Sequence, residues 1–234
     1  MGLFNAATSG NLSSEDRSNL AREIGLNFSM AAEIRRTERS MRPGERRRIR
    51  LENVARLRII HAKALGDHRT RDAAEFFLTD IYPEETPPWR DSQALKAIPS
   101  LAKLLPENAL LALSAAALLD RLTEEADAKM AQAGLSASYE EAYAMAGQAL
   151  RERQIAALVD AGRALSSLAS SSMAKPALIA MRIPARLGGF GDLQSFLERG
   201  LAAFEQLQEP AEFAKNLAQD ELAEMRRILA LAAK

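Results

Sequence analysis

The residues best suited to catalysis or metal binding are few and widely spaced. The two histidines, His61 and His68, lie seven residues apart with Gly66 between them. The residue three positions before each is Arg58 or Leu65, so neither belongs to the Glu-x-x-His pattern of di-metal sites in helical bundles. Cysteine is absent, which excludes thiol nucleophiles, disulfide scaffolds and Cys-ligated metal centres. We interpret both histidines as structural, with a ligand or general-base role as the alternative, and we predict no metal and no cofactor.

A second group of side chains surrounds the proline-rich segment 83–88. Aromatic rings on a helix here are typical of core packing, and Asp91 is suited to cap a helix that follows it. Glu198 lies on an otherwise apolar helix face and is expected to pair with Arg90 or Arg186 in a partly buried ion pair. The alternative is a ligand pocket with the following candidate residues: Phe76, Tyr82, Trp89, Arg90, Asp91 and Glu198.

A glycine-rich turn, Gly188 to Gly191, precedes a predicted helix. It lacks the spacing of a nucleotide-binding P-loop, and no strand leads into it. We favour a tight turn that lets two helices approach closely. Anion binding at the helix start, with help from Arg182 and Arg186, is the alternative.

The charges are unevenly distributed, although the formal net charge is zero. Residues 33–58 hold ten Arg and four Glu, including Arg46, Arg47 and Arg48, whereas residues 84–141 hold five Lys or Arg and ten Asp or Glu. We interpret the basic segment as a solvated face, or as a face paired with the acidic half or with a second subunit. Binding to nucleic-acid phosphates by residues 35–58 is the alternative, but no aromatic residue lies there to stack on bases.

The composition predicts an all-α protein. Hydrophobic residues make up 47% of the chain and aromatics only 5%, and Val54 and Val159 are the only valines, which disfavours a sizeable β-sheet. Ala, Leu, Glu and Arg, all strong helix formers, are abundant. No repeat of fixed period is present, so we expect a single bundle of about eight to ten helices rather than a solenoid.

Caps, glycines and prolines set the predicted boundaries. Residues 1–12 are predicted to be a flexible N-terminus, and residues 13–234 one helical domain. Residues 13–65 are alternatively a projecting helical hairpin. The predicted helices cover about 13–40, 44–65, 70–82, 92–105, 107–133, 138–147, 149–172, 192–208 and 210–231, with a further segment that starts at Pro176 and is interrupted by Pro184.

The most apolar stretch, Ala109 to Leu119, contains Ser114 and ends at Asp120-Arg121. It is too short for a membrane span and is typical of a buried core helix. The first residues also lack the pattern of a signal peptide. We therefore expect a soluble, cytoplasmic protein that does not bind membranes.

Several motifs in order resemble an uncharacterised bacterial family known by its Phe-Phe-Leu-Glu-Glu (FFLEE) motif. The resemblance rests on Glu75–Pro83 (EFFLTDIYP), Trp89–Asp91, Leu104–Pro106, Arg151–Ile155 and, most densely, Pro184–Phe204. The sequence departs from the family pattern at Thr79 and Asp80. The resemblance implies an all-helical protein and supplies no activity.

Because the candidate groups do not form a recognised catalytic constellation, we first expect a non-enzymatic interaction or scaffold protein that self-associates or binds a protein partner. Charge pairing between subunits would make such association sensitive to salt. The alternatives are a small-molecule-binding or enzymatic bundle with a pocket near Tyr82, Arg90, Asp91 and Glu198, and nucleic-acid binding by the Arg-rich segment 35–58.

Overall fold

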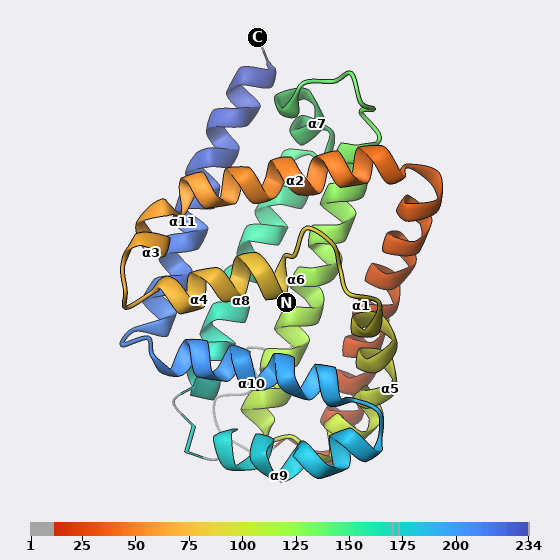
Figure 1. Ribbon diagram of the computed structural model, residues 1–234, viewed down its shortest axis with the longest axis vertical. Helices are drawn as coiled ribbons and strands as arrows, with labels where there is room; N and C mark the ends of the chain where they lie inside the picture. Colours follow the sequence, from red (N-terminus) through yellow and green to blue (C-terminus); the bar gives the residue numbers. More distant parts are fainter. Residues whose placement is uncertain (1–11, 170, 173, 234) are drawn as a thin grey trace.

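The computed structural model describes residues 12–169, 171–172 and 174–233, so the predicted flexible N-terminus, residues 1–12, lies outside the described residues except for Leu12. Within these ranges the chain forms eleven α-helices and one π-helix, with no strand, which confirms the all-α prediction (Figure 1). The elements are α1 (Ser14–Met41), α2 (Pro43–Ile60), α3 (Ala62–Gly66), α4 (Arg71–Phe76), the π-helix η2 (Phe77–Ile81), α5 (Pro88–Leu104), α6 (Glu107–Ala131), α7 (Tyr139–Met145), α8 (Gln148–Ala169), α9 (Ala174–Leu187), α10 (Gly191–Glu205) and α11 (Pro210–Ala232).

Helices α6 and α8 form the centre of a single domain. They pack against each other, with α1 on the other side of α6 and α11 on the other side of α8. Helices α2, α4 and α10 cross these long helices (Figure 1). Residues 13–65 do not project as a hairpin, because α1 packs along α5 and α6, and α2 crosses α6 and contacts α11.

Local sequence signals explain many helix boundaries. Ser13 and Ser138 begin α1 and α7 with capping boxes, in which each serine side chain accepts a hydrogen bond from a backbone N–H three residues later. Gly147 adopts a φ of +77° between α7 and α8, a conformation that glycine tolerates best.

Four predicted features of the helices are wrong. The segment that starts at Pro176 is not interrupted at Pro184, because α9 continues through that residue to Leu187. The helix predicted over 44–65 breaks at His61, and the one predicted over 70–82 becomes α4 followed by the π-helix. Helix α5 begins at Pro88 rather than Ser92, because a proline at the first helical position lacks only an N–H that would be unpaired there. Trp89 therefore lies in the first turn of α5 and not in a loop.

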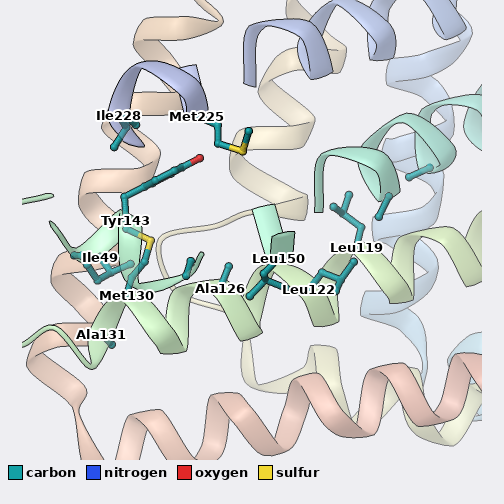
Figure 2. Close-up of a cluster of buried hydrophobic side chains, with 14 of the residues drawn as sticks. Ile49, Leu119, Leu122, Ala126, Met130, Ala131, Tyr143, Leu150, Met225 and Ile228 are labelled. Carbon is teal, nitrogen blue, oxygen red and sulfur yellow. The ribbon is translucent and has the colours of Figure 1, made fainter. Parts of the chain in front are cut away.

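The largest buried cluster lies where α6 and α8 meet α7, α11 and Ile49 of α2. In Figure 2, the Tyr143 side chain lies among Met130, Met225 and Ile228. A Cβ added at Gly162 would lie 1.9 Å from the Cβ of Ala214, so only glycine allows α8 and α11 to approach this closely. None of the helices in the described ranges is both long and apolar enough to span a bilayer.

Candidate functional site

Two rows of polar side chains face each other across the α2–α6 contact. Helix α2 contributes Arg46, Arg50 and Asn53, and α6 contributes Asp120, Glu124 and Asp127, all of them buried. Both rows have spacings of four and three residues, which places each row on one face of its helix. Burial of so many charges is tolerated only when they are paired, so the pairing decides what each group does.

Glu124, only 1% exposed, is the centre of this cluster. Arg46 Nη2 lies 2.9 Å from its Oε2, and Arg35 Nη1 donates to its Oε1 at 3.1 Å. Arg50 Nη2 also donates to Oε1. Burial by itself raises the pKa of Glu124, but Arg50, Arg46 and Arg35 outweigh burial and lower the pKa to about 2.

Asp120 joins this cluster to the segment around the π-helix. It accepts from Arg35 Nη1 at 3.0 Å and from Arg90 Nη2 at 3.0 Å. Arg90 also donates to the backbone carbonyl of Ile81 at 2.9 Å, and Arg35 Nε donates to Asp91 at 3.1 Å. The start of α5 and the end of the π-helix are thereby fixed to α1 and α6.

Asp127 is held mainly by neutral donors. Tyr82 Oη donates to it at 2.7 Å and Asn53 Nδ2 at 2.9 Å, while Arg50 Nε lies 3.4 Å away. Burial raises the pKa of Asp127, and burial together with the charge of Asp127 raises the pKa of Tyr82. The guanidinium of Arg50 stacks 4.2 Å above the Tyr82 ring in a cation–π contact, so Asp127, Tyr82 and Arg50 form one corner of the cluster.

Beside this corner lies a cavity of about 120 Å³, which we call the polar cavity. Its lining includes Arg50, Arg56, Arg151 and His61 as cationic or titratable groups, and Asp120, Asp127 and Glu221 as carboxylates. Tyr82, Thr123 and Gln154 add neutral polar groups, and Phe77, Ile81, Leu119 and Leu158 are among its apolar walls.

The carboxylates that line the polar cavity have partners within the chain. Glu221 accepts from Arg56 at 2.9 and 3.3 Å, and His61 Nε2 lies 3.3 Å from it. Burial raises the pKa of Glu221, but Arg56 and His61 outweigh burial and lower it to about 2. Asp120 and Asp127 are paired as described above.

Arg151 of α8 differs from the other buried arginines. It is 4% exposed, and no carboxylate in the described ranges lies within 4 Å of it. Its Nη1 donates to Gln154 Oε1 at 2.8 Å, its guanidinium stacks 4.1 Å from the Tyr143 ring centroid, and its Nε has no hydrogen-bond partner. Gln154 in turn donates to Thr123 Oγ1 at 2.9 Å. The polar cavity therefore contains a buried guanidinium that contacts no carboxylate among the described residues, although its charge acts to lower the pKa of the nearby Asp127, which burial raises.

A second cavity, of about 150 Å³, lies between α5, α6, α8 and α10; we call it the apolar cavity. Nearly all its lining side chains are aliphatic or aromatic, among them Phe76, Trp89, Phe196, Leu197 and Leu201. Three lining residues, Phe77, Ile81 and Leu119, are common to both cavities.

The structure separates the predicted pocket residues. Tyr82 lines the polar cavity, whereas Phe76, Trp89 and Arg90 line the apolar one. Asp91 is not in the described lining of either cavity and pairs with Arg35. Glu198 is likewise outside both linings. It pairs with Arg182 at 2.7 Å on the surface of α9 and α10, and of its two predicted partners only Arg186 acts on it, through a smaller contribution that lowers its pKa.

The predicted anion-binding arginines also occupy different environments. Arg46 is buried on Glu124, and Arg48 donates to the backbone carbonyls of Leu135 and Ala137. Arg47 and Arg186 are exposed. The basic segment is thus not a uniform solvated face, because its buried members pair with the acidic half of the chain, as one of the predicted alternatives held.

The histidines also differ in environment. His61 is buried beside Glu221, whereas His68 is 88% exposed near Asp67. The part of the chain that the structure describes holds no group of three or more side chains suited to a metal ion.

Sequence reasoning missed Glu124, Asp127 and Arg151 as candidates. For the first two, a signal exists: Asp120, Glu124 and Asp127 occupy core-type spacing among Leu119, Leu122 and Ala126. Arg151 has a similar spacing with Ile155 and Leu158 and belongs to the Arg151–Ile155 motif, but its lack of a carboxylate partner depends on contacts between distant segments, which the sequence does not show.

Comparison with known proteins gives a family without an assigned role. The model of the domain of unknown function DUF8198 matches residues 35–234, most of the chain. Neither a curated protein nor a solved structure matches. The resemblance to the FFLEE family and the bacterial origin stay predictions.

Proposed function

We propose that this chain, which belongs to the family of the domain of unknown function DUF8198, binds a small molecule with one anionic group in its polar cavity. The observation that carries the proposal is Arg151, a buried guanidinium that lines the cavity without a carboxylate partner. A buried charge is strongly disfavoured unless it is paired, and a bound anion supplies the pair.

The groups around Arg151 suit recognition of an anion. Its Nε lacks a hydrogen-bond acceptor, and Thr123 and Gln154 line the same cavity. Guanidinium groups form strong charge-assisted hydrogen bonds with carboxylate and phosphate oxygens. Tyr143 fixes the guanidinium from one face, so the group is oriented before the ligand arrives.

The proposal is tested by isothermal titration calorimetry with sodium octanoate, sodium benzoate and inorganic phosphate as probes. We expect saturable binding of at least one probe to the full chain. Arg151→Met should raise the Kd of the bound probe about 10- to 100-fold, since a hydrogen bond to a charged group contributes about 1.5–3 kcal/mol. Met keeps the aliphatic stem beside Tyr143 and removes the charge.

Arg153→Met is the matched control, because Arg153 is exposed on the same helix and lies outside the described lining of the polar cavity. The control should bind as the unmodified chain does. Equal Kd values for the two variants, or no binding of any probe, would contradict the proposal.

A second candidate, self-association, is favoured by an exposed aliphatic stripe on α9. Ile179, Ile183 and Leu187 recur every fourth residue and are 50%, 72% and 86% exposed. The same stripe on a second copy gives a self-complementary pair about a two-fold axis. We no longer expect this self-association to be sensitive to salt. Arginines of the basic segment such as Arg46 are already paired within the chain and are not available to pair with a second subunit.

Light scattering after size-exclusion chromatography tests this second candidate. We expect a mass above 25.5 kDa that high salt does not lower, since apolar contacts are not screened. Ile183→Glu should yield the monomer, whereas Ala202→Glu, at an exposed position of α10 outside the stripe, should not. A monomer at every concentration would contradict it.

A further inference from the structure

The two cavities meet at one apolar wall. Phe77 and Ile81, the two ends of the π-helix, and Leu119 of α6 line both of them. On one side of this wall lies the unpaired guanidinium of Arg151, and on the other lies an almost wholly apolar chamber. The arrangement matches the two parts of an amphipathic molecule.

The apolar cavity is too large to be explained as ordinary packing. Protein interiors contain few voids larger than a water molecule. A hydrocarbon-lined cavity of about 150 Å³ stays dry and takes up a molecule the size of benzene. The apolar cavity has that volume, so it accommodates about six carbon atoms.

We propose that the ligand is a medium-chain fatty acid whose carboxylate pairs with Arg151 and whose hydrocarbon tail passes the Phe77–Leu119 wall into the apolar cavity. This inference rests on the proposed function, since it takes the anionic group at Arg151 as given. About six tail carbons in the apolar cavity, together with the carboxyl carbon and the carbon next to it, correspond to octanoate.

The charges of the polar cavity favour a monoanion over a phosphate dianion. Arg151 supplies a single unpaired positive charge, whereas Asp127 and Glu221 line the same cavity. A second negative charge on the ligand would lie near these carboxylates without a cation to balance it. The carboxylate, with one charge and two acceptor oxygens, fits one guanidinium.

The wall has a structure suited to let a chain through. The Tyr82 N–H donates to the Phe77 carbonyl at 2.9 Å, which closes one widened π-type turn, and such turns are frequent at functional sites. Phe77 is only half-buried and packs at ring-centroid distances of 5.8 Å from Phe204 and 6.3 Å from Phe213. Arg90 holds the Ile81 carbonyl, so the backbone at this end of the wall is fixed, and passage of a hydrocarbon tail would require the Phe77 side chain to move.

The fluorescence of Trp89 can show whether the hydrocarbon tail of the ligand enters the apolar cavity. Trp89 is the only tryptophan and it lines the apolar cavity. Titration with butyrate, hexanoate, octanoate, decanoate and palmitate should change Trp89 emission. Affinity should rise about fourfold per methylene up to octanoate, because each buried methylene contributes about 0.8 kcal/mol, and should stop rising once the cavity is full. Octanol, which lacks the charge, should bind at least tenfold more weakly than octanoate.

A variant that fills the apolar cavity gives the second arm. Ala116 lines the cavity and its side chain is accessible, so Ala116→Phe places a ring in that space without displacing a buried neighbour. We expect it to weaken octanoate binding more than tenfold and butyrate binding little. Ala156→Phe, at an exposed position of α8 outside the described linings of both cavities, is the control and should change neither.

The outcomes separate the two proposals. Binding that requires Arg151 but does not vary with chain length or with Ala116→Phe would overturn the fatty-acid inference and leave the anion site standing. Octanoate binding that is unchanged in Arg151→Met, or octanol binding as tight as octanoate, would overturn the anion site and the fatty-acid inference with it.

Discussion

Two buried arginine environments lie close together along α6, and they differ in whether the chain itself balances the charge. Around Glu124, the guanidinium groups of Arg35, Arg46 and Arg50 all contact a carboxylate of the chain. Around Arg151, the described residues offer an amide, a ring and a thioether but no carboxylate. The first environment joins helices α1, α2 and α6, and the second faces a cavity.

The difference separates structural from functional charge. A cluster whose charges are balanced by other residues of the chain needs no ligand, and removing one of its members lowers the free energy of unfolding. A buried charge without a partner destabilises the folded state, and a bound ligand of opposite charge offsets that destabilisation. The comparison therefore predicts that substitution of Glu124 strongly lowers stability and leaves ligand binding unchanged. Substitution of Arg151 should weaken ligand binding and change stability little.

The largest expected effect is at Glu124. Glu124→Gln leaves Arg35, Arg46 and Arg50 buried with too little negative charge, and should lower the free energy of unfolding by about 3–5 kcal/mol. Urea denaturation measures it without the screening that guanidinium introduces. Glu125→Gln, on the next residue and paired with Arg121 near the surface, should cost less than about 1 kcal/mol. If both variants lost the same free energy of unfolding, the buried cluster would contribute no more to stability than a surface ion pair does.

The pH dependence of stability tests the same cluster. The pKa of Glu124 and of Glu221 is about 2 in the folded state, below the value of about 4.5 in the unfolded chain. Each contributes stability that is present above about pH 4.5 and is lost as pH falls toward 2, on the order of 3 kcal/mol per group. Asp127, whose pKa is raised, acts in the opposite direction.

Urea denaturation between pH 7 and pH 3 should therefore show falling stability, with a shallower slope in Glu124→Gln. A slope unchanged by that substitution would show that the arginines do not depend on Glu124 for their charge balance.

At Arg151 the expected stability change is smaller. Arg151→Met removes a buried charge that has no carboxylate partner in the described ranges, together with one hydrogen bond to Gln154 and the stacking on Tyr143. These terms oppose each other, so the free energy of unfolding should change by less than about 1 kcal/mol in the absence of ligand. Thermal unfolding with octanoate should then show stabilisation of the unmodified chain but not of the variant. A loss of about 3 kcal/mol without ligand would place Arg151 in the structural group.

The sequence predicted the helices well where the signals are local. Ser13 and Ser138 cap helices through their own neighbours, and Gly147 ends one by its own backbone freedom, so these boundaries follow from a few adjacent residues. The π-turn from Phe77 to Tyr82 and the break at His61 were missed because they depend on packing against α10, α2 and α11.

The candidate site was predicted only in part, for the same reason. Tyr82, Trp89 and Arg90 line the cavities, and the motif around them was visible in the sequence. Whether a buried charge has a partner is a property of segments as distant as Arg35 and Asp120, which no spacing along one helix reveals.

The smallest effect is expected at Glu198, which the sequence suggested as a pocket residue. Arg182 and Gln194 donate to its carboxylate and lower its pKa to about 2, but its side chain and that of Arg182 are 28% and 52% exposed. Solvent screens such pairs, so Glu198→Gln should lower the free energy of unfolding by less than about 1 kcal/mol, and less still in high salt.

Glu198→Gln should also leave octanoate binding unchanged, because Glu198 lies outside the described linings of both cavities. Calorimetry on this variant beside Arg151→Met makes the contrast direct: a binding loss at Glu198 would mean that an exposed ion pair on α9 and α10, and not a buried unpaired charge, controls the site.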